Sequence, residues 1–418
     1  MALLLLGPAG PAFAEEAKID SGDTAWILTS TALVLAMTAP GLALFYSGMV
    51  RRKNALGTMM HSFIALCLVS VQWVVIGYSL AFGSSVGGIF GGFDFVGMKG
   101  ITGAPNGTIP DSVFVAFQMV FAVITVALIS GAVAERMKFS AFILFALLWT
   151  TIIYDPLTYW VWGGGWIGSM GALDFAGGTV VHISSGVSAL VAAIVLGKRV
   201  GHGKDAMQPH NLTLVLIGAS LLWFGWFGFN AGSALGANSS AGMAFLVTNT
   251  AAAAAGLSWM FAEWAYRGKP TLLGAASGAV AGLVAITPAA GFVGPISSII
   301  IGLGAGVICY FGIIMKGKMG FDDSLDVFAV HGLGGTWGAI ATGLFANEVY
   351  GGANGLFFGE PGQLMKQIMA VGATYVLAIV GTFIILKVVD VVVGLRVSEE
   401  EERTGLDISQ HNESGYVL

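Results

Sequence analysis

Apolar residues fill long stretches of the chain, and short joints rich in polar residues, glycine or proline separate these stretches. A helix that crosses a membrane needs about 20 mostly apolar residues. Eleven stretches fit this length, near residues 25–48, 57–82, 112–134, 139–159, 178–197, 212–233, 241–265, 272–289, 295–315, 325–346 and 364–393. The pattern predicts an all-α polytopic membrane protein with eleven transmembrane helices.

The two ends of the chain differ from its apolar body. Residues 1–14 contain a short apolar run and finish in Ala-Phe-Ala, which is typical of a secretory signal peptide. No basic region precedes the run, so an uncleaved start is the alternative. Residues 15–395 form the predicted transmembrane domain, and residues 396–418 form a polar tail.

Basic residues predict the orientation of the bundle. Fourteen of the 18 lysines and arginines follow odd-numbered helices, namely Arg51, Arg52, Lys53, Arg136, Lys138, Lys198, Arg199, Lys204, Arg267, Lys269, Lys316, Lys318, Arg396 and Arg403. Cytoplasmic loops carry an excess of such residues. We therefore expect the N-terminus outside, the C-terminus in the cytoplasm, and a location in a bacterial inner membrane.

Composition agrees with a membrane protein and excludes several other classes. The chain is 56% hydrophobic and only 10% charged, which leaves too little polar surface for a soluble protein of 418 residues. Its 62 glycines suit close packing between helices in lipid. No basic stripe indicates nucleic acid, and Cys67 and Cys309 have no metal or redox spacing, so we interpret them as packing residues.

A short similarity links two helices that are five apart in the series. The sequence LDFA at 173–176 precedes His182, and LDVFA at 325–329 precedes His331. Helices five apart run in opposite directions, so we expect an inverted repeat of about 25–197 and about 212–346, with 364–393 as an added helix. Transporters built from inverted repeats bind substrate at the interface between the repeats.

Both histidines are expected near the middle of the membrane, where ionisable groups are costly and usually face a cavity. A single histidine there is as often a hydrogen-bonded packing residue. Two at matched positions favour a shared site. No further His or Cys and no paired carboxylates were identified at that depth, which argues against a membrane enzyme that uses a metal.

Aromatic residues from three segments are expected at one depth near the outer side. Phe121 belongs to one predicted helix, Trp162 follows another, and Phe229 and Ser233 share a face of a third. Aromatic faces attract cations, so this group indicates a mouth that recruits a cation. An interfacial aromatic belt is the alternative.

Two aspartates lie at the starts of the matched helices. Asp174 is expected on the outer side and Asp326 on the cytoplasmic side. Each suits a helix cap, because a carboxylate favours a helix N-terminus. Each can also lower the energy of a cation nearby.

These segments resemble the Amt/Mep/Rh ammonium transporter family, over nearly the whole chain after the signal peptide. The similarity rests on PGLALFY at 40–46, DFAGGTVVH at 174–182, WFGFNAGS at 226–233 and DVFAVHG at 326–332. Trp162 and Ser233 fit the bacterial Amt branch better than the Rh branch, and they argue against a carrier of another gas such as carbon dioxide.

The resemblance implies a role for each candidate residue. It places an outer ammonium site at Phe121, Trp162 and Ser233, supported by Asp174. It makes Phe121 and Phe229 a gate. It makes His182 and His331 the lining of a narrow apolar pore, with further pore positions at Phe45, Trp226 and Thr287.

The resemblance also implies partners. The family is homotrimeric, and the tail from residue 394 is similar to one that supports docking of a PII-family regulatory protein. The tail departs from the family at His411-Asn412-Glu413, where members often have His-Gly-Glu.

We therefore expect an ammonium channel rather than an enzyme, with no cofactor. Ammonium is expected to bind outside, lose its proton and cross as ammonia, either alone or with the proton moved by a separate route. A sensor that signals through a cytoplasmic partner is the alternative.

Overall fold

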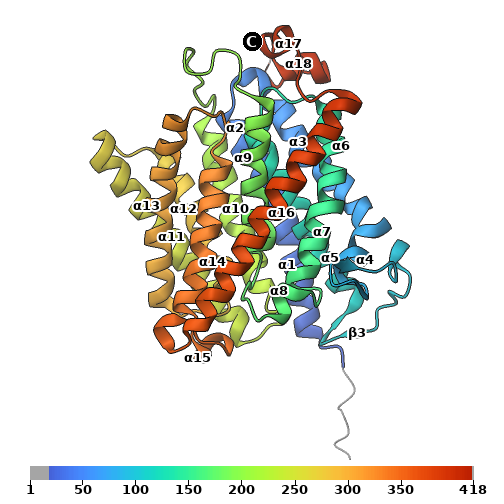
Figure 1. Ribbon diagram of the computed structural model, residues 1–418. Helices are drawn as coiled ribbons and strands as arrows, with labels where there is room; N and C mark the ends of the chain where they lie inside the picture. Colours follow the sequence, from blue (N-terminus) through green and yellow to red (C-terminus); the bar gives the residue numbers. More distant parts are fainter. Residues whose placement is uncertain (1–17, 417–418) are drawn as a thin grey trace, which may run out of the picture.

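The computed structural model describes residues 18–416, which form a bundle of long helices (Figure 1). The predicted signal peptide, residues 1–14, lies outside the described residues. Helix α1 (Ser21–Ala36) starts at one end of the bundle, and the chain finishes at the opposite end (Figure 1). An odd number of membrane crossings places the two ends of a chain in this way.

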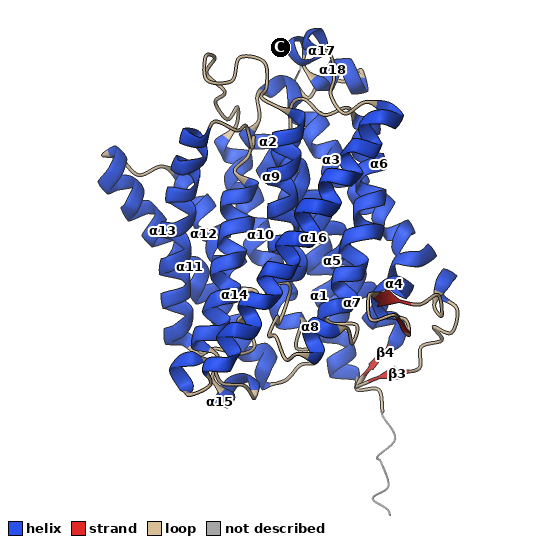
Figure 2. Cartoon of the chain, in the orientation of Figure 1, coloured by secondary structure: helices blue, strands red, loops and turns tan. Residues whose placement is uncertain are grey.

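Within residues 18–416, helices account for nearly all of the ordered architecture, and the strands lie in the connection between α4 and α5 (Figure 2). The other α-helices are α2 (Ala43–Met49), α3 (Ala55–Gln72), α4 (Tyr78–Phe82), α5 (Asp111–Val133), α6 (Phe139–Trp149), α7 (Asp155–Val161), α8 (Trp166–Ser169), α9 (Ser184–Leu196), α10 (Leu212–Gly232), α11 (Ser239–Arg267), α12 (Leu272–Ile286), α13 (Pro295–Met319), α14 (Gly334–Phe345), α15 (Glu348–Gly351), α16 (Pro361–Val393), α17 (Glu399–Thr404) and α18 (Leu406–His411). Two antiparallel hairpins pair β1 (Ser85–Val86) with β2 (Phe90–Gly91), and β3 (Pro105–Asn106) with β4 (Ile109–Pro110).

Wider π-helical turns interrupt several of the long helices. They are η1 (Met37–Leu42), η3 (Trp73–Gly77), η5 (Thr150–Tyr154), η6 (Gly178–Ile183) and η7 (Phe328–Leu333). Three short 3₁₀ turns lie in loops, at η2 (Arg52–Asn54), η4 (Val96–Met98) and η8 (Leu356–Phe358). A π-turn adds one residue to a helical turn and is frequent at functional sites.

Within residues 18–416, nine helices are long and apolar enough to cross a membrane, counted with the turns that continue them. Two of the eleven predicted spans are not among the nine. One is α12, which has 15 residues, and the other is the pair η7 and α14. The helical membrane fold is therefore confirmed, whereas the count of eleven spans stays a prediction.

Basic residues that were predicted to share one side of the membrane do meet at one end of the bundle. Arg199 contacts Asp322 at 2.8 Å and Glu135 at 3.0 Å, and Arg51 also pairs with Glu135 at 2.8 Å. Burial by itself raises the pKa of Asp322, but the hydrogen bonds and charge of Arg199 outweigh burial and hold this pKa well below its usual range. This ionic cluster connects the ends of several helices.

The tail packs against the same end of the bundle, where α17 and α18 lie beside the C-terminus (Figure 1). Glu402 pairs with Arg396 at 2.8 Å. Asp407 accepts a hydrogen bond from the backbone N–H of Gly57 at 2.8 Å, and Asn54 accepts one from Leu406 at 2.8 Å. The tail is thus an ordered cover over the start of α3.

Candidate functional site

Three cavities follow one another through the bundle. The first, which we call the Trp162 vestibule, is lined by Phe121, Trp162 and Ser233 among others. The second, the central cavity, is lined by Phe229, His182 and His331 among others. The third, the Asp326 vestibule, shares Phe45, Val280 and His331 with the central cavity.

Hydrogen bonds fix the polar groups of the Trp162 vestibule. The Trp162 indole N–H donates to the backbone oxygen of Asp174 at 2.9 Å. The Ser233 hydroxyl donates to the backbone oxygen of Phe229 at 2.8 Å. Because that bond uses the only hydroxyl hydrogen, the Ser233 oxygen can only accept a further hydrogen bond, through its lone pairs. The vestibule therefore offers aromatic rings and a hydrogen-bond acceptor, which suit a small cation that carries N–H donors.

Two phenylalanine rings separate the vestibule from the central cavity. Phe121 and Phe229 are both buried, and their rings stack with centroids 4.2 Å apart and an interplanar angle of 25°. Phe121 also meets Trp162 edge to face at 6.1 Å. A hydrated ion cannot pass two stacked rings, so passage requires the rings to move.

Asp174 is not among the residues that line the vestibule. Its carboxylate accepts from the backbone N–H groups of Gly177 at 2.8 Å, Gly178 at 2.6 Å and Thr179 at 2.7 Å, and also from the Thr179 hydroxyl. These are the donors that the start of η6 leaves without a partner inside the helix. Asp174 thus caps the helix that carries His182 and holds Trp162 through its own backbone.

The two histidines meet at the base of the central cavity. His182 Nδ1 and His331 Nδ1 are 3.3 Å apart, and both residues are buried. A hydrogen bond between two Nδ1 atoms makes one a donor and the other an acceptor, so one Nε2 carries a hydrogen and the other a lone pair. His182 Nε2 has no partner among residues 18–416. The pair can therefore donate to, and accept from, a small neutral molecule.

Close packing of two backbones brings the histidines together. Gly186 lies one helical turn after His182, and a Cβ at that position would be 2.1 Å from the Gly332 nitrogen. No residue with a side chain fits there without separating the two helices. The approach joins α9 to η7 and sets the distance between the imidazoles.

Further side chains complete the wall of the central cavity. The Trp226 indole N–H donates to the Thr287 hydroxyl at 2.9 Å, and that hydroxyl donates to the Leu283 backbone at 2.8 Å. The Trp226 ring stacks on His182 at 5.4 Å. Thr287 is fully buried and does not line the cavity, so it acts on the pore by holding Trp226.

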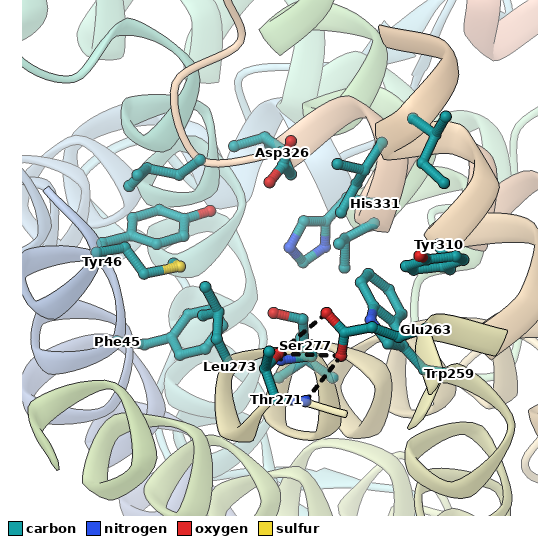
Figure 3. A pocket seen from close by; sticks show the side chains of 18 of the residues that line it. Phe45, Tyr46, Trp259, Glu263, Thr271, Leu273, Ser277, Tyr310, Asp326 and His331 are labelled. Carbon is teal, nitrogen blue, oxygen red and sulfur yellow. Dashed lines mark hydrogen bonds between the residues drawn. The ribbon is translucent and has the colours of Figure 1, made fainter. Parts of the chain in front are cut away.

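The Asp326 vestibule opens on the other side of the histidines, and Figure 3 shows His331 pointing into it. Asp326 is partly exposed and pairs with Lys316. Glu263, also at this vestibule, accepts from the Thr271 backbone at 3.0 Å and from its hydroxyl (Figure 3). Glu263 and Thr271 are functional candidates that sequence reasoning missed, because neither lies near a recognised motif.

A family model described as the Ammonium Transporter Family matches residues 25–416. An ammonium transporter of Bacillus subtilis (strain 168) is 55% identical over 403 residues, which cover 94% of this chain and 98% of that protein. This chain belongs to the ammonium transporter family. It is accordingly a membrane transport protein and not an enzyme.

Solved structures of ammonium transporter family members have the same fold. Mep2 of Saccharomyces cerevisiae superposes with a TM-score of 0.87 at 36% identity, over 92% of this chain and 89% of that chain. A structure described as a sensor Amt protein superposes with a TM-score of 0.87 at 31% identity, over 93% and 98% of the two chains.

One detail of the predicted repeat is wrong. The counterpart of Asp174 is Asp323 and not Asp326, since Asp174 and Asp323 each precede a histidine by eight residues. Asp323 is fully buried and accepts from the Phe328 backbone N–H at 2.8 Å, as Asp174 does at η6. The shared Leu-Asp pair caused the misalignment, and the equal spacing to the histidines would have identified Asp323.

Proposed function

We propose that this member of the ammonium transporter family is a channel that recruits ammonium at the Trp162 vestibule, removes its proton there, and conducts ammonia past His182 and His331. The observation that carries the proposal is the series of three cavities with the histidine pair at its centre. Metal chemistry is not part of it, and the described residues hold no cluster of three or more metal-ligating side chains.

Recruitment rests on the chemistry of the Trp162 vestibule. Trp162 and Phe121 present rings whose faces attract a cation by about 0.5–2 kcal/mol each. Ser233 presents an oxygen that accepts a hydrogen bond. Potassium has the same charge and a similar size but no N–H groups, so only ammonium can donate a hydrogen bond to this oxygen.

Loss of the proton rests on the apolar wall beyond the phenylalanine stack. The central cavity is lined by Met37, Leu42, Ile124 and similar side chains, and its polar groups come from the histidines and Trp226. A full charge at the middle of a membrane costs at least about 3 kcal/mol. Ammonia avoids this cost and can exchange hydrogen bonds with the two imidazoles. Potassium cannot become neutral, so the same wall rejects it.

Several broader features belong to the same proposal. The chain would cross a bacterial inner membrane eleven times, with the Trp162 vestibule outside and the tail in the cytoplasm. The basic residues gathered at the tail end support this orientation. Three copies would assemble, each with its own pore, and a PII-family protein would bind at the face that carries Asp326.

An ammonium jump on proteoliposomes tests the channel. Internal pH, from a trapped dye, and membrane current are recorded together, with protein-free liposomes as the control for ammonia that crosses the lipid. Internal alkalinisation without current means that ammonia moves alone, and an ammonium-specific current means that the proton crosses as well. Either result supports the channel. If both the internal pH and the current respond as they do in protein-free liposomes, the channel function is contradicted.

A sensor function is the second candidate, because a solved relative is described as a sensor Amt protein and its fold covers 93% of this chain. A sensor requires ammonium to change what the cytoplasmic face binds. Cells that carry the protein with His182→Ala would then keep an ammonium-dependent response without uptake. Loss of both together would contradict a separate sensor role.

A further inference from the structure

A carboxyl group lies inside the bundle, away from all three cavities. Asp155 begins α7, which belongs to a predicted membrane span, and its side chain is fully buried. It does not line the central cavity or either vestibule. Asp155 was not predicted from the sequence, because it belongs to none of the recognised motifs.

Asp155 does not cap a helix. The backbone runs from η5 into α7 without a break, and Asp155 itself has helical dihedral angles of −60° and −48°. No side-chain capping bond occurs at this point. Among residues 18–416, its one hydrogen bond to another side chain comes from Gln72 on α3, whose Nε2 donates to Asp155 Oδ2 at 2.7 Å.

The orientation of the Gln72 amide follows from its second hydrogen bond, which is to the Thr151 hydroxyl. The Thr151 hydroxyl donates to the Leu147 backbone oxygen at 2.8 Å, so its oxygen can only accept from Gln72. The group 3.1 Å away from that oxygen must therefore be the amide nitrogen. Both of its hydrogens are used, and Asp155 Oδ1 and Gln72 Oε1 have no partner among residues 18–416.

Charge decides the state of this carboxyl group. No lysine, arginine or histidine of the described residues pairs with Asp155. Of the titratable groups on elements packed against α7, Tyr154 directly precedes Asp155, Tyr78 lies on α4, and His182 lies on η6, where its ring meets His331. Asp174 is engaged by the start of η6. An ionised Asp155 would place a negative charge inside the membrane with only one neutral hydrogen-bond donor to stabilise it, which is energetically costly.

A buried hydroxyl lies between this group and the Trp162 vestibule along the sequence. Thr158 follows Asp155 by three residues and so shares its face of α7, and Trp162, the residue directly after α7, follows Asp155 by seven. Seven residues of helix span about 10 Å. The Thr158 hydroxyl and the Tyr154 hydroxyl are buried without a partner among the described residues, as Asp155 Oδ1 is. Groups of this kind hold ordered water.

Two π-turns place these residues. Gln72 directly precedes η3, and Asp155 directly follows η5, and the two turns contact each other. The wider turn shifts the register of each helix by one residue and aims the amide of α3 at the carboxyl group of α7. Such turns are frequent where a helix serves a function rather than only packing.

We propose that Asp155 is a proton-binding site in the membrane, which holds its proton on Oδ1 and exchanges it with the Trp162 vestibule along the Thr158 face of α7. The step is a simple ionisation: the O–H bond of the acid breaks and the proton passes to water of the vestibule. If the proposed transport function holds, the site provides a place outside the pore where a proton released from ammonium can reside.

The site is tested by the infrared difference spectrum between the full-length wild type and Asp155→Asn, both recorded in lipid at neutral pH without ammonium. A protonated carboxyl group absorbs above the amide I band, and Asp155→Asn should remove the band assigned to it. Asparagine has the shape of the neutral acid, so this variant should fold. The matched control is Asp390→Asn, because Asp390 lies at the end of α16 and accepts from the Leu395 backbone N–H at 3.1 Å. The control should keep the band.

Exchange is measured by transfer into heavy water, which shifts the band. Thr158→Val removes the hydroxyl between Asp155 and the vestibule and should slow this shift at least tenfold. A band that is absent from the wild type, or that persists in Asp155→Asn, overturns the proposal. A band that disappears when sodium replaces choline reveals a metal-cation site instead and overturns it too. An unchanged exchange rate in Thr158→Val overturns the path. Since no ammonium is used, these outcomes do not depend on the proposed transport function.

Discussion

Replacement of Gly186 by alanine tests whether the backbone crossing of α9 and η7 sets the geometry of the histidine pair. The new Cβ would lie 2.1 Å from the nitrogen and 2.6 Å from the Cα of Gly332. Ordinary van der Waals contact needs at least 3.4 Å, so the helices must separate by about 1 Å. Extra atoms in a packed core cost about 1–3 kcal/mol. The protein should fold with reduced thermal stability.

The separation should also lengthen the contact of 3.3 Å between His182 and His331 beyond hydrogen-bonding range. A displacement of about 1 Å at a working site can lower a rate on the order of 100-fold. The assay is ammonium uptake by proteoliposomes at equal protein content, together with the thermal unfolding temperature. We expect a large loss of uptake beside a small loss of stability.

Gly372→Ala is the matched control. A Cβ at Gly372, within α16, meets nothing within 4 Å, and alanine is the better helix former by about 1 kcal/mol. This control should keep both uptake and stability. If Gly186→Ala also kept full uptake, the crossing would not be what positions the imidazoles, and the reasoning from backbone contact to pore geometry would be refuted.

Three further changes test other parts of the structure. Asp322→Asn should lower the free energy of unfolding by about 1.5–3 kcal/mol, because the buried Arg199 guanidinium loses one of its two carboxylate partners and keeps Glu135. Since the folded pKa of Asp322 lies below the unfolded value of about 3.9, wild-type stability from this pair should be complete above that pH and decline only as pH falls further; a decline between pH 8 and 6 in thermal unfolding would contradict the assignment. Ser233→Ala should raise the KM of ammonium uptake on the order of tenfold with kcat unchanged, because it removes an acceptor for a charged donor worth about 1.5–3 kcal/mol; an unchanged KM would exclude Ser233 from the binding site. Thr287→Val should lower the free energy of unfolding by about 1–3 kcal/mol, because the Trp226 indole N–H loses its acceptor. The matched control is Thr250→Val, which should cost little because the Thr250 hydroxyl is exposed. Equal effects of the two variants would argue against a role of Thr287 in holding Trp226.

Periodicity and composition predicted most of the helical bundle, because apolar length is a direct physical requirement of the membrane. The two spans that fall short of that requirement, around Leu272–Ile286 and around His331, border the cavities and contain many small residues. Leu272–Ile286 is apolar but has only 15 residues, and the helix around His331 contains a histidine and several glycines. The π-turns left no visible signal in the sequence, since a shift of one residue does not alter the apolar pattern.

Site residues that lie in recognised motifs were predictable from the sequence, whereas those defined only by their contacts in space were not. Motifs indicated the histidines and the vestibule residues, and the structure brings Phe121, Trp162 and Ser233 to one cavity. For Asp174 the sequence left a helix cap and the support of a cation open, because both need the same residue type, and the structure shows its carboxylate bound to the start of η6. Asp155 was not predicted, because its local sequence does not indicate which helix packs against it.

The most direct test of the central claim is the current that purified protein in proteoliposomes carries when ammonium, and then potassium, is added to the wild type and to His182→Ala. The account predicts that the wild type rejects potassium, and that the variant either loses ammonium transport or admits potassium, because the pore needs the imidazole pair to pass ammonia and exclude ions. A variant that transports ammonium as the wild type does, and still rejects potassium, would contradict a pore built on the two histidines.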